Sequence, residues 1–171
     1  MTPTARVILG MLRLGARTGY EIKQATDVST RFFWGASYGQ IYPELRKLEE
    51  AGLVTAAADA PGGRRRRAYE LTEAGDRALR DWLVADEPLE FSVRDEGLLK
   101  VFFGDVGSRD ELVENVRRLR RDHESRLAHF REIQARVEGR DSTVRALEYG
   151  IAFLEWNVRW WRGVEQELES P

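Results

Sequence analysis

The segment Ser37–Glu50 constrains the fold most strongly, because it combines a helix start signal with one narrow apolar face. Ser37 and Gln40 have the spacing of a capping box, in which Ser37 caps the helix and Gln40 reaches back to the Ser37 N–H. Apolar residues then recur at helical spacing on a single side: Ile41, Leu45 and Leu48. Gly52 is placed to end the helix. The segment is therefore predicted to be one amphipathic helix.

Shorter elements surround this helix in an informative order. Two helices are predicted before it, over residues 3–14 and 18–28, because apolar residues recur there at helical spacing. A β-hairpin is predicted after it, with strands at 53–57 and 67–71 around the turn Pro61-Gly62-Gly63. A further helix begins at Thr72. This order predicts a winged helix-turn-helix, in which three helices are followed by a β-hairpin wing.

The second half of the chain has a different pattern. Pro88 lies in a short acidic stretch, and long charged segments with helical apolar spacing follow it, over 108–138 and 142–169. The predicted fold is therefore mainly α, with an N-terminal winged helix-turn-helix DNA-binding domain over residues 1–87. An α-helical dimerisation domain, with effector sensing as a further role, is predicted over residues 88–171.

The helix at 37–50 is the predicted DNA-reading element. The second helix of a helix-turn-helix enters the major groove with its N-terminal part leading. Glutamine can read adenine there, and arginine or lysine can bind guanine or phosphate. The candidate DNA-binding residues of this helix are Ser37, Tyr38, Gln40, Tyr42, Arg46 and Lys47. Taken alone, the pattern of this helix is equally consistent with a solvated face that touches no DNA. Tyr20, in the preceding helix, is a further candidate, because its hydroxyl could contact a phosphate, although a core position is also consistent with its place in the sequence.

The sequence of the wing favours the DNA-binding interpretation. Four consecutive arginines, Arg64, Arg65, Arg66 and Arg67, follow the Gly-Gly turn, where they repel one another but suit contacts with phosphates or the minor groove. Residues 1–85 carry 13 Lys and Arg against 10 Asp and Glu, whereas residues 86–171 carry 14 against 19. The basic first half therefore favours a polyanionic partner. A solubilising basic loop is the alternative.

These motifs together resemble those of the PadR family of transcriptional regulators. The signature residues are Ser37–Leu45, Leu48-Glu49 and Gly52–Val54, the flanking patterns are Gly19–Ile22 and Tyr69–Gly75, and Leu98–Gly104 resembles the start of the family's helical C-terminal domain. The resemblance implies a homodimer that usually represses transcription and is often released by a small, commonly aromatic effector. We accordingly expect a cytoplasmic homodimer whose two winged helices bind a pseudo-palindromic operator. The resemblance also implies that Tyr20, Tyr42 and the basic wing approach DNA.

The last predicted helix has two apolar faces. One has coiled-coil spacing and includes Ile151, Leu154, Val158 and Trp161; the other carries Tyr149, Phe153, Trp156 and Trp160. One face can pack within the chain and the other against a symmetric partner, and the pattern leaves open which does which. The predicted dimer residues are Ile151, Leu154, Trp156, Val158, Trp160 and Trp161. The aromatic series together with His123 is an alternative effector site, although a buried, hydrogen-bonded His123 is the simpler interpretation.

Other classes of function find little support. The chain has no cysteine, so it forms no disulfide or thiolate metal site, and with two histidines a zinc site is not expected. The sequence contains no nucleophile–base set and no phosphate loop, which predicts neither an enzyme nor a cofactor. No apolar run is long enough for a membrane span. The remaining alternative to DNA binding is a winged-helix module that binds only protein.

Overall fold

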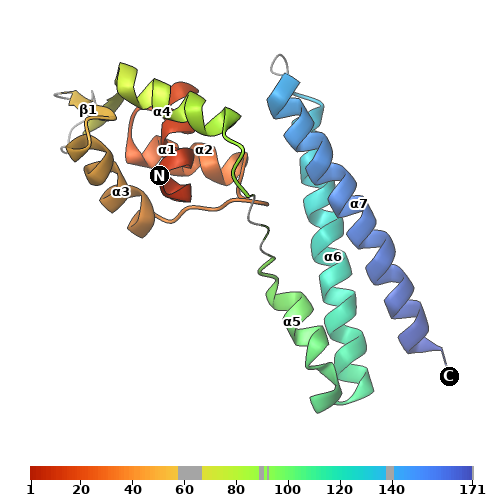
Figure 1. The fold of residues 1–171 in the computed structure, drawn as a ribbon. Helices are drawn as coiled ribbons and strands as arrows, with labels where there is room; N and C mark the ends of the chain where they lie inside the picture. The colour runs from red at the N-terminus through yellow and green to blue at the C-terminus, as the bar shows by residue number, and fades with distance from the viewer. Residues whose placement is uncertain (58–66, 89–90, 92, 138–140, 171) are drawn as a thin grey trace. The chain divides into compact units, whose positions relative to one another are not determined.

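A computed structural model describes residues 1–57, 67–88, 91, 93–137 and 141–170 (Figure 1). Its contacts divide the chain into two compact units, Met1–Leu89 and Glu90–Pro171, beside the sequence-based boundary between residues 87 and 88. In the described residues, the first unit contains four helices and one pair of antiparallel strands, and the regular elements of the second unit are all helices. The predicted mainly α fold with a small antiparallel sheet is confirmed.

The first unit has the predicted winged-helix order. Its elements are α1 (Pro3–Arg13), α2 (Gly19–Val28), α3 (Tyr38–Glu50), β1 (Val54–Ala57), β2 (Ala68–Leu71) and α4 (Glu73–Val84). Threonines cap three of the helices: the hydroxyls of Thr2, Thr18 and Thr72 accept the N–H groups that open α1, α2 and α4. The helix starts are thus set by local chemistry that is visible in the sequence.

The hairpin is tied to the turn that precedes α2. Strands β1 and β2 pair antiparallel from Val54 opposite Leu71 to Ala57 opposite Ala68. Ala68 also forms a bridge with Thr18, and the Tyr69 N–H donates to the Arg17 carbonyl at 2.6 Å. The base of the wing is therefore fixed beside the start of α2. The predicted Pro-Gly-Gly turn and three of the wing arginines, Arg64, Arg65 and Arg66, lie outside the described residues.

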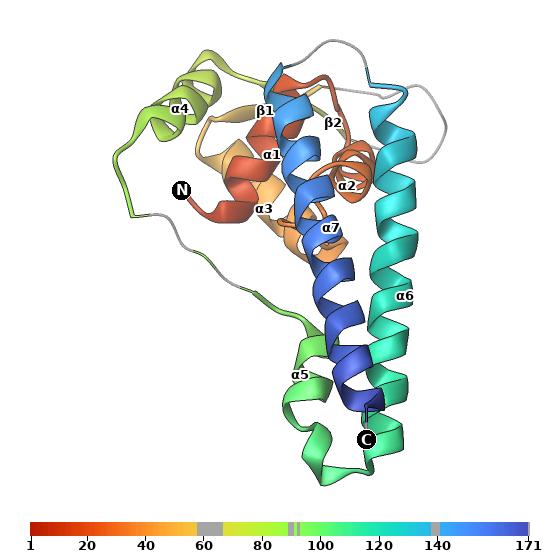
Figure 2. The ribbon, with the colours of Figure 1, turned by 90° about the vertical axis from the view of Figure 1, so that its right-hand side faces the viewer.

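The second unit is built on two long helices. Its elements are α5 (Glu96–Phe102), a short 3-10 helix η1 (Gly104–Val106), α6 (Arg109–Gln134) and α7 (Asp141–Glu169). Helices α6 and α7 lie side by side and antiparallel, and both views show them together along most of their length (Figures 1 and 2). Their shared core contains Leu127 from α6 and Ile151, Leu154 and Val158 from α7.

This packing corrects part of the dimer prediction. Ile151, Leu154, Val158 and Trp161 are only 8, 5, 7 and 2% exposed within a single chain. The coiled-coil seam of α7 is thus buried inside its own unit, mainly against α6, and cannot be the contact with a partner. The aromatic face remains uncovered, with Tyr149, Phe153, Trp156 and Trp160 between 43 and 59% exposed.

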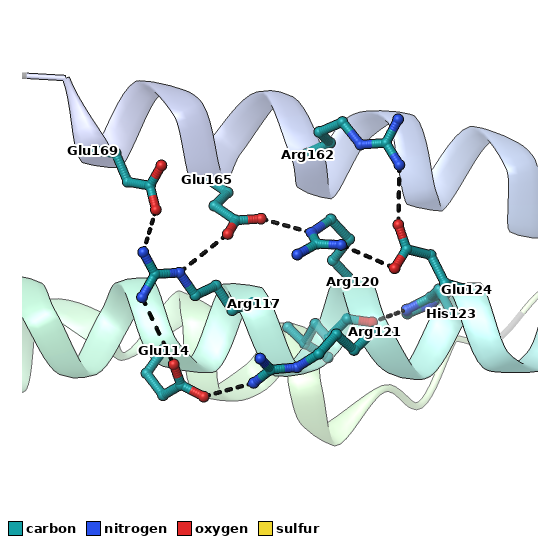
Figure 3. A network of polar contacts seen from close by, with 10 residues as sticks. Glu114, Arg117, Arg120, Arg121, His123, Glu124, Arg162, Glu165 and Glu169 are labelled. Atoms are coloured by element: carbon teal, nitrogen blue, oxygen red, sulfur yellow. Dashed lines mark hydrogen bonds and ion pairs between the residues drawn. The ribbon is translucent and has the colours of Figure 1, made fainter.

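A network of ion pairs fastens α6 to α7 beside this core (Figure 3). Glu165 of α7 accepts from the Arg120 Nε at 2.6 Å and from the Arg117 Nε at 3.1 Å. Glu124 of α6 accepts from Arg120 and from Arg162, both at 2.9 Å. The hydrogen bond from Arg120, joined by that from Arg117, holds the pKa of the Glu165 carboxyl below its usual value, although desolvation acts in the opposite direction.

We predict that Glu165→Gln lowers the free energy of unfolding at pH 7 by about 1 kcal/mol, because both arginines lose a charged partner. A carboxyl whose pKa is lower in the folded state stabilises the fold above its unfolded pKa and loses that contribution as the pH falls. The difference from wild type should therefore shrink below about pH 4. Urea denaturation at several pH values measures it, with exposed Glu167→Gln as control, and a pH-independent loss would contradict the assignment.

Candidate nucleic-acid interface

Helix α3 divides sharply into a buried and an exposed side. Ile41 and Leu45 are 0% exposed and Leu48 is 4% exposed, and they pack with α1, α2 and β1 in the first unit's core. The polar and aromatic side chains predicted to meet DNA are all exposed: Ser37, Tyr38, Gln40, Tyr42, Arg46 and Lys47. The structure therefore leaves these candidates exposed around the part of α3 that is not buried, and Tyr42 and Arg46 lie beside Arg67 at the base of the wing.

The N-terminal turn of α3 is held by its capping box. The Ser37 N–H donates to the Gln40 Oε1 at 2.9 Å, and the Ser37 Oγ lies 3.0 Å from the same oxygen. The amide oxygen of Gln40 is thus engaged within the protein. Bidentate reading of adenine needs both the oxygen and the nitrogen of the amide, so Gln40 would have to release its cap to make that contact.

Tyrosines line the junction between α2 and α3. The rings of Tyr38 and Tyr42 stack with their centroids 6.0 Å apart, and the Lys23 ammonium lies 5.8 Å from the Tyr38 ring. A Cβ at Gly19 would lie 2.7 Å from the Tyr42 Cε1, so this glycine leaves room for the Tyr42 ring beside the start of α2. Tyr20, which the sequence left between core and surface, is 38% exposed, and its hydroxyl accepts from Gln24 at 2.7 Å.

Two cations and several hydroxyls converge on a pocket of about 350 Å³ at this junction. Its lining comes from the start of α2, from α3 and from the base of the wing: Thr18, Gly19, Tyr20, Tyr42, Arg46, Arg67 and Tyr69. Guanidinium forks and phenolic hydroxyls are donors that suit the oxygens of a phosphate. This concentration of donors makes the pocket the candidate anion site of the first unit.

Sequence reasoning missed the acidic partners of the arginines around this pocket. The Arg67 Nη1 lies 3.1 Å from the Glu49 Oε2, and Arg17 pairs with Glu70. Helical spacing offered one signal, because Glu49 follows Tyr42 by seven residues and Arg46 by three, which places it on the same side of α3. The pairing with Arg67 joins residues 18 positions apart and has no local signature.

The residues predicted for an effector site differ in exposure within a single chain. His123 is 5% exposed, and its Nδ1 lies 2.7 Å from the Leu119 carbonyl oxygen, so the ring is buried and hydrogen-bonded. The four aromatic residues lie on the uncovered side of α7, where Tyr149 stacks on Phe153 and Trp156 stacks on Trp160. The described part of the chain contains no group of three or more His, Asp or Glu placed to hold a metal ion.

Comparison with known proteins assigns both units. Residues 8–81 match the transcriptional regulator PadR-like family, and residues 93–169 match the family described as virulence activator alpha C-term. Residues 8–81 therefore carry a PadR-like domain. The negative transcriptional regulator PadR of Bacillus subtilis is 39% identical over 105 residues, which cover 61% of this chain and 58% of that relative.

Solved structures of PadR-like proteins match nearly the whole chain. Bacillus subtilis PadR in complex with operator DNA superposes with a TM-score of 0.83 at 26% identity, covering 96% of this chain and 98% of that one. The same protein in complex with p-coumaric acid gives 0.73 at 25% identity, covering 100% and 99%. The Vibrio cholerae virulence activator AphA gives 0.70 at 29% identity, covering 96% and 97%. Among the residues that the structure describes, no helix combines the length and apolarity needed to cross a bilayer.

We predict that Gln40→Ala lowers the free energy of unfolding by about 1 kcal/mol, because the Ser37 N–H loses its capping partner. Gln40→Glu is the matched control, since a carboxylate keeps the capping acceptor and suits the positive end of the helix dipole. Denaturant unfolding of the three proteins measures the effect. A Gln40→Ala protein as stable as wild type would show that the hydrogen bond from the Ser37 N–H to the Gln40 amide does not stabilise the helix.

Proposed function

We propose that this PadR-like chain is a homodimeric transcriptional repressor that binds a pseudo-palindromic DNA operator and is released by a small aromatic effector. One observation carries the DNA-binding part of the proposal. The apolar side of α3 is buried in the core, while its tyrosines and cations are exposed, and Tyr42 and Arg46 lie beside Arg67 at the base of the wing. That arrangement suits a helix that enters the major groove while neighbouring donors hold the phosphate backbone.

Each group of residues has a distinct part in this proposal. The exposed N-terminal half of α3, with Tyr38 and Tyr42, faces base edges and sugars, and Lys47 contacts the backbone. Tyr20, Arg46 and Arg67 bind one phosphate in the pocket between α2, α3 and β2. The wing arginines Arg64, Arg65 and Arg66 extend the contact along the backbone. Gln40 orders the first turn of the helix.

The comparisons support a regulator with a ligand. One relative is a negative regulator, and structures of Bacillus subtilis PadR contain operator DNA or p-coumaric acid. We propose the same pair of partners here, with repression as the sign of regulation. We further propose that the protein acts in the cytoplasm, where a bacterial-type operator lies, and that it has no catalytic activity. A module that binds only protein would lack salt-dependent DNA affinity.

The aromatic face of α7 is the proposed dimer contact. Its four rings form two stacked pairs, with centroids 6.5 Å apart for Tyr149 and Phe153 and 6.0 Å apart for Trp156 and Trp160. Since the seam residues are already buried within the chain, this is the face of α7 that remains for a partner. Leaving large aromatic side chains in water forfeits about 1.5–3 kcal/mol each, which a symmetric copy recovers.

Replacing Arg46 tests the phosphate contact. Arg46→Ala should weaken binding to every duplex sequence and reduce the magnitude of the log–log salt slope by about 0.9, because one phosphate contact is lost. Fluorescence anisotropy over a range of salt concentrations measures the slope. Arg77→Ala, on α4 and outside the pocket, is the matched control. A wild-type protein without salt-dependent DNA binding would refute the proposed function.

Replacing Trp156 tests the dimer. Trp156→Glu should raise the dimer dissociation constant about a hundredfold or more and abolish operator binding, because a charge is placed in an apolar contact and the two readers separate. Sedimentation at micromolar concentration with circular dichroism on the same samples distinguishes a folded monomer from an unfolded chain. Trp156→Phe should remain dimeric. If Trp156→Glu also remains a dimer, the aromatic face is not the contact.

A further inference from the structure

The wing arginine that lines the phosphate pocket is already bound to a carboxylate. The Arg67 Nη1 lies 3.1 Å from the Glu49 Oε2, and the Arg67 side chain also forms part of the pocket with Arg46 and Tyr42. The Glu49 side chain is 29% exposed, against 62% for that of Arg67. The carboxylate therefore competes for a guanidinium that a phosphate would need.

The position of Glu49 means that its pairing with Arg67 affects how a phosphate can bind. Glu49 lies in the last turn of α3, where the helix dipole disfavours a negative charge. A guanidinium binds carboxylate and phosphate through the same kind of N–H donor. The Glu49 carboxylate at Nη1 therefore competes with a phosphate for that group and lowers the positive charge that the phosphate meets. When a phosphate takes Arg67, Glu49 is left without this partner, close to both the helix end and the DNA backbone.

We propose that Glu49 is a specificity-determining residue that holds Arg67 away from DNA of arbitrary sequence. Binding to arbitrary DNA depends on phosphate contacts alone, so an internal competitor for one cation weakens it directly. At an operator, base contacts made by α3 fix the backbone against the pocket, and the phosphate then displaces the carboxylate. This inference rests on the proposed DNA-binding function and adds a residue that limits binding at the wrong sites.

The opposite role makes the opposite prediction. If the carboxylate oriented Arg67 towards a phosphate, its removal would weaken binding to DNA. If Glu49 contributed only net charge, any nearby acidic residue on α3 would have the same effect. Glu50 is the matched control, because it is the next residue, is exposed, and loses the same charge in Glu50→Gln.

The test uses the full-length chain and a random-sequence duplex about three helical turns long, with affinity measured over a range of salt concentrations. Glu49→Gln should bind about three- to tenfold more tightly than wild type at low salt, and its salt slope should increase in magnitude by up to about 0.9. Glu50→Gln should change affinity by less. In a protein that already carries Arg67→Ala, Glu49→Gln should increase the affinity for DNA no more than Glu50→Gln does.

The outcomes separate this inference from the function on which it rests. If wild type binds the duplex and Glu49→Gln binds equally or more weakly, the competitor role is wrong while DNA binding stands. The same holds if the gain from Glu49→Gln persists in the Arg67→Ala background, since it would then act independently of Arg67. A wild-type protein that does not bind the duplex would overturn the proposed function, and this inference with it.

Discussion

Burial of the apolar side of α3 is the interaction on which the candidate DNA interface depends. Ile41, Leu45 and Leu48 are withdrawn from water against α1, α2 and β1, which is worth about 1.5–3 kcal/mol for each side chain. Together they rival the whole stability of a small domain, about 5–15 kcal/mol. Helix α3 therefore cannot rotate about its axis without unfolding the unit, and the direction of its exposed tyrosines and cations is fixed.

The wing is placed by a second set of constraints that begins at the same helices. Thr18 caps α2 through its side chain and bridges to Ala68 through its backbone, and the Tyr69 N–H bonds the Arg17 carbonyl. These contacts hold Arg67, at the base of the wing, close to Arg46 and to the C-terminal turn of α3. The candidate anion site and the carboxylate beside it thus depend on how β2 is attached.

Local signals predicted most of the fold, and long-range pairing decided what they could not. Caps, helical periodicity and the turn gave the winged-helix order and the exposed side of α3, because each depends on residues within a few positions. Both faces of α7 carry apolar residues at heptad-like spacing, so spacing alone could not choose between them. The choice was made by α6, where Leu127 and the arginines that bind Glu165 meet only one side of α7. The Glu49–Arg67 pair depended on tertiary contact in the same way.

Selection of bound duplexes from a random pool by the purified, full-length protein tests the central claim most directly. A pair of identical winged helices related by two-fold symmetry predicts an enriched motif that is pseudo-palindromic, with half-site centres about 10 base pairs or a multiple of that apart. No enrichment at moderate salt, or a single half-site without a symmetric mate, would contradict the account of a dimer that reads DNA through two copies of α3.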